Sequence, residues 1–144
     1  MQLRDVMTRS IEEVPPEATL KDAAEKMRAL DIGVLPVCEA EHKVIGMITD
    51  RDIAIRAVAK GRDPNKTKVR EAMSSDLIFC HDDDSVEAAA KLMEERQIRR
   101  LPILDKTQHL CGIVSLGDLA TRDREEHISE EVLEKVSQPK QTHA

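Results

Sequence analysis

The sequence predicts an α+β protein built from two copies of one β-α-β-β-α repeat. The main observation is that the 144-residue chain aligns with itself, without gaps, at a shift of 66 positions. Identical pairs at this shift include Met7 with Met73, Leu35-Pro36 with Leu101-Pro102, and Arg56 with Arg122. A second observation is that each copy has one helical apolar face followed by two short apolar runs typical of strands. The chain is therefore expected to form two related structural units.

The first helix of each copy is predicted from apolar residues at the spacing i, i+3, i+4, i+7. Thr19 and Ser85 stand just ahead of these residues, where a hydroxyl caps the free N–H groups of a helix. Asp22 is placed to complete a capping box with Thr19. The apolar residues are Leu20, Ala23, Ala24 and Met27 in the first copy, and Val86, Ala89, Ala90 and Met93 in the second. The paired alanines should let each helix pack closely on a sheet.

Two strands follow the helix in each copy. The first is "GVLPVCE" or "RRLPILD", and the second, after a polar turn, is "VIGMIT" or "LCGIVS". Proline has no N–H for a central ladder, so its presence indicates a sheet edge or a bulge. The last helix of each copy is predicted to begin at Asp50 or at Leu116.

The predicted organisation is a first motif over residues 1–61, a linker over 62–68, a second motif over 69–124 and a tail over 125–144. The polar stretch "KGRDPNKT", with its glycine and proline, marks the linker. Within the tail, "HISEEVLEKVSQ" has the apolar spacing of a short amphipathic helix. That helix is expected to pack on its own chain or on a partner subunit.

The composition argues against two classes of function, nucleic-acid binding and membrane spanning. The chain is 40% hydrophobic and 35% charged, with a net charge of −6, one Phe and no Trp or Tyr. This balance argues against nucleic acid as a partner, because phosphate binding needs positive charge and base stacking needs aromatic rings. No apolar run approaches the roughly 18 residues of a membrane span, and the N-terminus has no secretory apolar segment. A cytoplasmic location is therefore expected.

Catalytic motifs are missing from the sequence. It contains no G-x-S-x-G, H-E-x-x-H, P-loop or G-x-G-x-x-G pattern, and no pair of carboxylates is placed for acid–base catalysis. No catalytic residue is assigned, no cofactor is expected to be required, and the protein is not expected to be an enzyme.

The segment "CHDDDS" places Cys80 and His81 before three acidic residues. We interpret it as an acidic loop that leads into a helix, where negative charge near the N-terminus is favourable. The alternative is a zinc or other metal site formed by Cys80 and His81 with His42, His109 or a second subunit. No ligand spacing fixes such a site. The three cysteines form no C-x-x-C pair and are expected to be reduced structural thiols, with a redox bridge as the alternative.

A short signature recurs at the end of the second strand. Gly46, Thr49 and Asp52 in the first copy correspond to Gly112, Ser115 and Asp118 in the second. A hydroxyl residue followed three positions later by an acid is the pattern of a capping box. The same pattern could present a hydroxyl and a carboxylate to a ligand, because a carboxylate accepts hydrogen bonds from two vicinal hydroxyls. Both interpretations remain open from the residues alone.

The duplication, the "LPV" and "LPI" strands and the repeated signature make residues 3–123 resemble a tandem CBS (cystathionine-β-synthase) domain protein. Within that family, "MITDRDIAIRAVAKGRDPN" and "QIRRLPI" are most similar to small stand-alone bacterial CBS-pair proteins, some associated with stress and hypoxia. The resemblance implies two motifs packed with pseudo-twofold symmetry and a disc-shaped homodimer. It also implies clefts between paired motifs that bind AMP, ADP, ATP or S-adenosylmethionine.

The resemblance also implies roles for individual residues. Asp52 and Asp118 would accept the ribose hydroxyls, and Thr49 and Ser115 would meet phosphate beside a helix N-terminus. Gly46 and Gly112 would allow close approach of the backbone. The remaining candidate nucleotide-binding residues are Val34, Pro36, Arg51, Arg99, Arg100, Leu101 and Pro102.

The two sites are expected to differ in charge. Arg99 and Arg100 stand where the first copy has Gly33 and Val34, whereas Asp50 stands opposite Leu116. Arginine forms charge-assisted bonds with phosphates. The Ser115/Asp118 site is therefore expected to bind polyphosphates more tightly.

The expected function is a regulatory module that binds an adenosine nucleotide, changes conformation and signals to an unknown downstream protein. The alternative is a structural or interaction protein with vestigial clefts that responds to metal or redox state.

Overall fold

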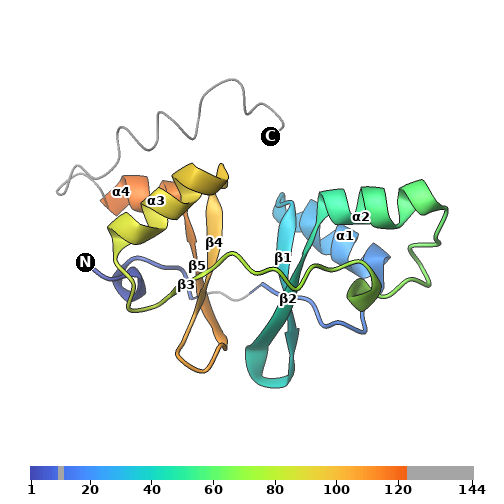
Figure 1. Ribbon diagram of the computed structural model, residues 1–144, viewed down its shortest axis with the longest axis horizontal. Coiled ribbons are helices and arrows are strands. Elements are labelled where there is room, and N and C mark those ends of the chain that lie inside the picture. The colour runs from blue at the N-terminus through green and yellow to red at the C-terminus, as the bar shows by residue number, and fades with distance from the viewer. Residues whose placement is uncertain (10–11, 123–144) are drawn as a thin grey trace. The chain divides into compact units, whose positions relative to one another are not determined.

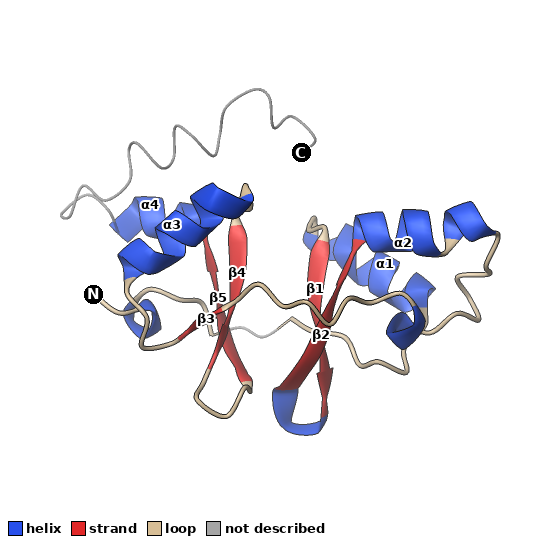
Figure 2. Ribbon diagram, viewed as in Figure 1, coloured by secondary structure: helices blue, strands red, loops and turns tan. Residues whose placement is uncertain are grey.

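The computed structural model describes residues 1–9 and 12–122. The chain divides into two compact units. Unit 2 comprises Glu12–Leu77, and unit 1 comprises Met1–Ile11 together with Ile78–Ala144. Figure 1 follows the chain through the labelled elements, and Figure 2 separates helices from strands. The predicted helix in the tail falls outside the described residues.

Unit 2 contains helix α1 (Leu20–Leu30), strand β1 (Val34–Glu39), strand β2 (Lys43–Thr49) and helix α2 (Asp50–Arg56). Short 3-10 turns η2, η3 and η4 cover Ala40–His42, Val58–Lys60 and Val69–Glu71. The strands β1 and β2 are antiparallel, with a bulge between Val37 and Cys38. Single bridges extend this ladder, from Val14 to Val37 on one side and from Ser74 to Met47 on the other.

Unit 1 repeats this plan. It contains turn η1 (Leu3–Asp5), strand β3 (Cys80–His81), helix α3 (Val86–Arg96), strand β4 (Arg100–Leu104), strand β5 (Leu110–Ser115) and helix α4 (Leu116–Arg122). Strand β4 is parallel to β3 and antiparallel to β5. The antiparallel pair has a bulge between Ile103 and Leu104, the positions equivalent to Val37 and Cys38 in the repeat. The mixed α+β fold expected from the sequence is confirmed.

Local predictions from the sequence hold closely. Thr19 and Ser85 cap α1 and α3 through hydrogen bonds from the N–H groups of Asp22 and Ala88. The proline strands carry bulges, as expected, and α2 and α4 begin at Asp50 and Leu116.

Two expectations need correction. The opening strand of the first copy is reduced to the bridge at Val14, whereas the corresponding Cys80 begins a strand of two residues. Ala24 is exposed, although its counterpart Ala90 is buried with the rest of the predicted apolar face. The two helices therefore use the alanine pair differently.

The compact units do not follow the sequence copies at their beginnings. Thr8 from the first copy forms its bridge with Ile113, and Ser74 from the second copy forms its bridge with Met47. These two bridges are equivalent at the 66-residue shift. Each copy thus contributes its opening segment to the unit that contains the other copy's strands. The predicted linker also belongs to unit 2, where the N–H of Leu20 donates to the carbonyl of Thr67.

Glycines in the two second strands admit these exchanged segments. A Cβ on Gly46 would lie 2.7 Å from the carbonyl oxygen of Ser74, and one on Gly112 would lie 2.9 Å from that of Thr8. Such distances are too short for a side chain, so only glycine lets the backbones come this close.

Candidate functional site

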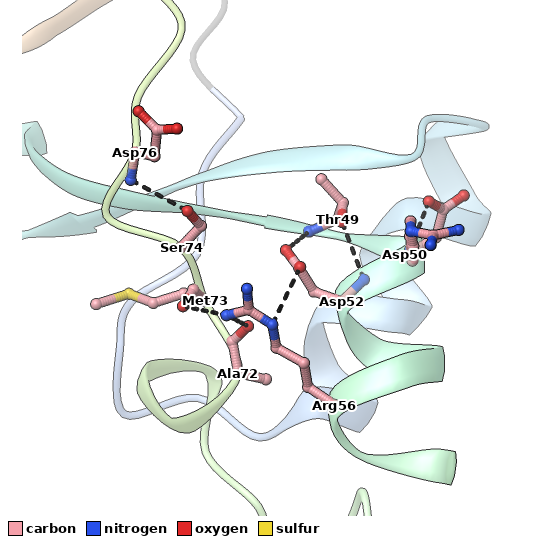
Figure 3. Close-up of polar contacts among 9 residues, drawn as sticks. Thr49, Asp50, Asp52, Arg56, Ala72, Met73, Ser74 and Asp76 are labelled. Carbon is pink, nitrogen blue, oxygen red and sulfur yellow. Dashed lines mark hydrogen bonds and ion pairs between the residues drawn. The ribbon is translucent and has the colours of Figure 1, made fainter.

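The signature residues of unit 2 lie where β2 ends and α2 begins. Thr49 is the N-cap of α2 and accepts a hydrogen bond of 3.0 Å from the N–H of Asp52 to its Oγ1. The N–H of Thr49 donates in return to Oδ2 of Asp52, also at 3.0 Å (Figure 3). This reciprocal pair is the capping box expected from the spacing.

Unit 1 reproduces the arrangement between β5 and α4. The N–H of Asp118 donates to Oγ of Ser115 at 3.0 Å, and the N–H of Ser115 donates to Oδ2 of Asp118 at 2.9 Å. All four side chains are partly buried. Each unit therefore holds one hydroxyl and one carboxylate in the same relation to a strand end.

The Asp52 carboxylate uses only one oxygen in the cap. Its Oδ1 lies 3.8 Å from Nε of Arg56 and accepts no hydrogen bond from any residue that the structure describes. The side chain of Asp52 is 16% exposed. One carboxylate oxygen thus stabilises the helix start while the other keeps its capacity to accept from a ligand.

Arg56 was not a predicted site residue. Its Nη1 donates to the carbonyl of Met73 at 3.2 Å and to that of Ala72 at 3.4 Å, while its Nε faces Asp52 (Figure 3). The sequence carried a signal for this residue, because Arg56 and Arg122 are identical across the repeat and follow the signature acid by four positions. The side chain of Arg122 lies outside what the structure describes.

The residues beside each signature differ between the units. We call this place the corner, and it consists of Gly33 and Asp50 in unit 2 and of Arg99 and Leu116 in unit 1. In unit 2, Asp50 accepts a hydrogen bond of 2.8 Å from the N–H of Arg51, and a Cβ on Gly33 would lie 2.8 Å from Oδ2 of Asp50. The backbone bond at this position is common to both units: the N–H of Asp50 donates to the carbonyl of Gly33 at 2.9 Å, and the N–H of Leu116 donates to that of Arg99 at 2.7 Å. The units differ in the side chains, because Leu116 has no carboxylate. A carboxylate occupies one corner, and an arginine flanks the other.

The other predicted site residues fall into two groups. Val34 pairs with Thr49 across the ladder, and Arg100 pairs with Ser115, so both lie next to a signature hydroxyl. The side chains of Arg51, Arg99 and Arg100 are exposed, whereas Pro36, Leu101 and Pro102 are buried in their strands. Gly46 and Gly112 face the chain's own exchanged segments, which accounts for both glycines without a ligand.

Cys80 and His81 take part in the acidic loop. Burial raises the pKa of the Cys80 thiol to about 11, with the charge of Asp84 as a smaller cause. Nε2 of the His81 ring lies 3.1 Å from Oε1 of Gln108, and the backbone N–H of His81 donates to Oδ2 of Asp84 at 2.8 Å. The carbonyls of Asp82 and Asp84 accept from the N–H groups of Arg4 and Leu3. This loop therefore binds the exchanged N-terminal segment.

The described residues offer no obvious metal centre. Within residues 1–9 and 12–122, no three His, Cys, Asp or Glu side chains group so that they could hold a metal ion. His42 pairs with Glu13 instead, and His109 with Thr107. All three cysteines are free thiols, and burial raises the pKa of each. In the same part of the chain, every helix is too short or too polar to cross a bilayer.

Comparison with known proteins finds the same duplication, because one family model matches the chain twice. The family model described as the CBS domain matches residues 3–58 and again residues 69–125. The CBS domain-containing protein YhcV of Bacillus subtilis is 46% identical over 118 residues, which are 82% of this chain and 82% of that protein.

Solved structures share the fold. The crystal structure of Hypoxic Response Protein I with two coordinated zinc ions is 36% identical, with a TM-score of 0.74 over 85% of this chain and 98% of that chain. The CBS domain pair of protein MJ0100, in complex with 5′-methylthioadenosine and S-adenosyl-L-methionine, is 26% identical. Its TM-score is 0.68, over 85% of this chain and 94% of that one.

Proposed function

Because the chain belongs to the CBS-domain family and carries two CBS repeats, we propose that it is a regulatory module that binds an adenosine compound through the signature residues of each unit. The ligand is AMP, ADP, ATP or a related adenosyl compound, and no catalytic step is assigned. The chain acts as a homodimer on a downstream protein. Binding regulates that protein only through unequal affinity for two conformations.

One observation carries this proposal: both units hold a hydroxyl and a carboxylate in the same capped geometry. Thr49 with Asp52 and Ser115 with Asp118 have matching hydrogen bonds of 2.9–3.0 Å. Each box orders its acid before a ligand arrives, so little side-chain entropy is lost on binding. The vicinal hydroxyls of a ribose are suitable donors to such an acid.

The capping box and the ligand site are compatible. The cap of α2 occupies Oδ2 of Asp52 and leaves Oδ1 for a donor, so the helix start need not be disrupted on binding. A ligand of uncharged or cationic character at its 5′ end suits unit 2, where Asp50 adds a negative charge next to Thr49. The related domain pair with 5′-methylthioadenosine and S-adenosyl-L-methionine is consistent with ligands of this kind.

Isothermal titration calorimetry with AMP, ADP, ATP, S-adenosylmethionine, 5′-methylthioadenosine and NAD tests the proposal. We expect saturable binding of at least one compound, reduced tenfold or more by Asp52→Ala or Asp118→Ala, because a hydrogen bond to a charged group contributes about 1.5–3 kcal/mol. Combining both substitutions should abolish binding.

The control for lost capping is Asp22→Ala. Asp22 forms the same kind of box with Thr19 at the start of α1, away from the signature. All three substitutions should lower the free energy of unfolding by about 1 kcal/mol, but Asp22→Ala should leave affinity unchanged. If no compound binds the wild-type protein at millimolar concentration, nucleotide sensing is wrong for this chain.

A zinc-dependent interaction protein is the second candidate, favoured by the two zinc ions in the structure that is 36% identical. Metal analysis of protein purified without a histidine tag distinguishes it. Stoichiometric zinc that is lost on substitution of Cys80 or His81 supports this candidate, and a metal-free protein eliminates it.

A further inference from the structure

Arg56 is the repeated residue that ribose and phosphate binding do not explain. It follows the signature acid by four positions, as Arg122 does in the second copy. Its side chain is about half exposed, so packing in the core does not account for it either. What distinguishes Arg56 is the set of groups that it contacts.

One guanidinium joins the signature acid to a distant backbone. Nε of Arg56 lies 3.8 Å from Oδ1 of Asp52, the oxygen that the capping box leaves unused. On its other side, Nη1 donates to the carbonyls of Met73 and Ala72 (Figure 3). The planar, five-donor guanidinium can face a carboxylate and carbonyls together, whereas a lysine ammonium is a single point charge.

The backbone that Arg56 contacts is attached to the same site by a second route. Met47 and Ser74 exchange two backbone hydrogen bonds, of 2.8 and 2.9 Å. Met47 lies on β2, two residues before the hydroxyl residue Thr49. Gly46 lets the Ser74 carbonyl come this close. Residues 72–74 are therefore connected to the signature through β2 on one side and through Arg56 on the other.

We propose that Arg56 is a positioning residue of the Thr49/Asp52 site that couples the occupancy of Asp52 to the backbone of residues 72–76. The inference rests on the proposed function. A ligand hydroxyl that donates to Oδ1 satisfies part of the Asp52 charge, and Arg56 then bonds more strongly to the two carbonyls. The segment becomes better ordered, and by reciprocity an ordered segment favours the ligand. After Leu77 the chain enters unit 1, so this segment is a direct covalent route out of the site.

The test isolates unit 2 by placing every variant in an Asp118→Ala background. The probe is 5′-methylthioadenosine, which has the ribose hydroxyls but no phosphate. Calorimetry gives its affinity, and hydrogen exchange measured by mass spectrometry follows residues 70–77 with and without the probe. The variants are Arg56→Ala and Arg56→Lys. Arg28→Ala is the matched control, because Arg28 is another exposed arginine on a helix of unit 2.

In the background protein, the probe should slow exchange over residues 70–77. Arg56→Ala should weaken binding about fivefold, because the carbonyl bonds that strengthen when the probe binds are missing, and it should abolish the slowing. It should also speed exchange there in the free protein, since two hydrogen bonds to carbonyls are lost. Arg56→Lys keeps the charge but loses the planar fork that bonds both carbonyls, so it should recover only part of the affinity and only part of the slowing of exchange. Arg28→Ala should behave like the background protein.

Two results overturn the inference while the proposed function stands: probe binding that Arg56→Ala leaves intact, or slowing of exchange that persists in Arg56→Ala. Failure of the proposed function looks different, because the background protein then binds no probe. In that case the coupling is also wrong, whatever Arg56→Ala does to the free protein.

Discussion

Asp50 is the residue that most clearly separates the two signature sites. Its carboxylate accepts from the N–H of Arg51 at the start of α2 and occupies the space that Gly33 leaves by lacking a side chain. In unit 1 the same position is Leu116, which is buried, and the position of Gly33 is taken by Arg99. A phosphate bound as proposed would be repelled by the Asp50 carboxylate at one site and attracted by Arg99 at the other.

Asp50→Asn removes this charge and keeps an oxygen for the Arg51 N–H. In an Asp118→Ala background, we expect it to tighten ATP binding about threefold to fivefold, with a larger gain at low ionic strength. Affinity for uncharged 5′-methylthioadenosine should stay the same and serves as the control. Calorimetry at two salt concentrations measures both. An equal loss of ATP affinity in Asp52→Ala and Asp118→Ala would contradict the underlying asymmetry.

The residues found by sequence inspection are those with local partners. Thr49 bonds to Asp52 three positions away, so the capping box follows from spacing alone. Arg56 bonds to the carbonyls of Ala72 and Met73, and any residue type supplies a carbonyl. No side-chain pattern could therefore reveal that contact. Only the repetition of Arg56 as Arg122 marked the position as unusual.

Among the elements, the second strand of each copy does the most to build the site. Strand β2 presents Thr49 at its end, pairs with β1 along its length and receives the bridge from Ser74 beside Gly46. Strand β5 repeats these roles with Ser115, β4 and Thr8. The glycine in each strand thus controls whether the exchanged segment can reach the sheet.

Gly46→Ala tests this control of the sheet edge. A Cβ there would lie 2.7 Å from the Ser74 carbonyl, a contact that backbone cannot relieve cheaply. We expect the free energy of unfolding to fall by about 1–3 kcal/mol in urea denaturation, as for other overpacked sites. Gly117→Ala is the control, since its nearest neighbour is Oγ of Ser115 at 3.6 Å. It should be neutral or stabilising by up to about 1 kcal/mol. Equal stability of the Gly46→Ala protein would refute the tight approach.

Across the whole molecule, the exchange of opening segments is what the sequence could not decide. At the 66-residue shift, Thr8 is equivalent to Ser74, and Met47 to Ile113. A bridge from Thr8 to Met47 therefore satisfies the repeat as well as the observed bridge to Ile113 does. The duplication, the capped starts and the helical faces, apart from Ala24, were all predictable, because they depend on residues within one copy. The strand with which each opening segment forms its bridge was not predictable.

Leu3 and Val69 provide a reciprocal test of the exchange. They are equivalent at the repeat shift, and both are fully buried, but Leu3 packs with the core of unit 1 and Val69 with that of unit 2. Leu3→Ala should cost about 2–5 kcal/mol and should speed hydrogen exchange in α3, whereas Val69→Ala should cost less and act on α1. Each variant is the control for the other. Faster exchange in α1 after Leu3→Ala would show that the segments are not exchanged.

The division of the chain also sets an order of events during synthesis. Unit 2 is one continuous stretch, Glu12–Leu77, so a ribosome has delivered all of it once Leu77 has emerged. Unit 1 joins residues near the N-terminus to strands that are made last, and its early segment must wait for β5 before Thr8 finds Ile113. Domains tend to fold as they emerge. Unit 2 is therefore expected to fold first, as a domain inserted in the sequence between the two segments of unit 1.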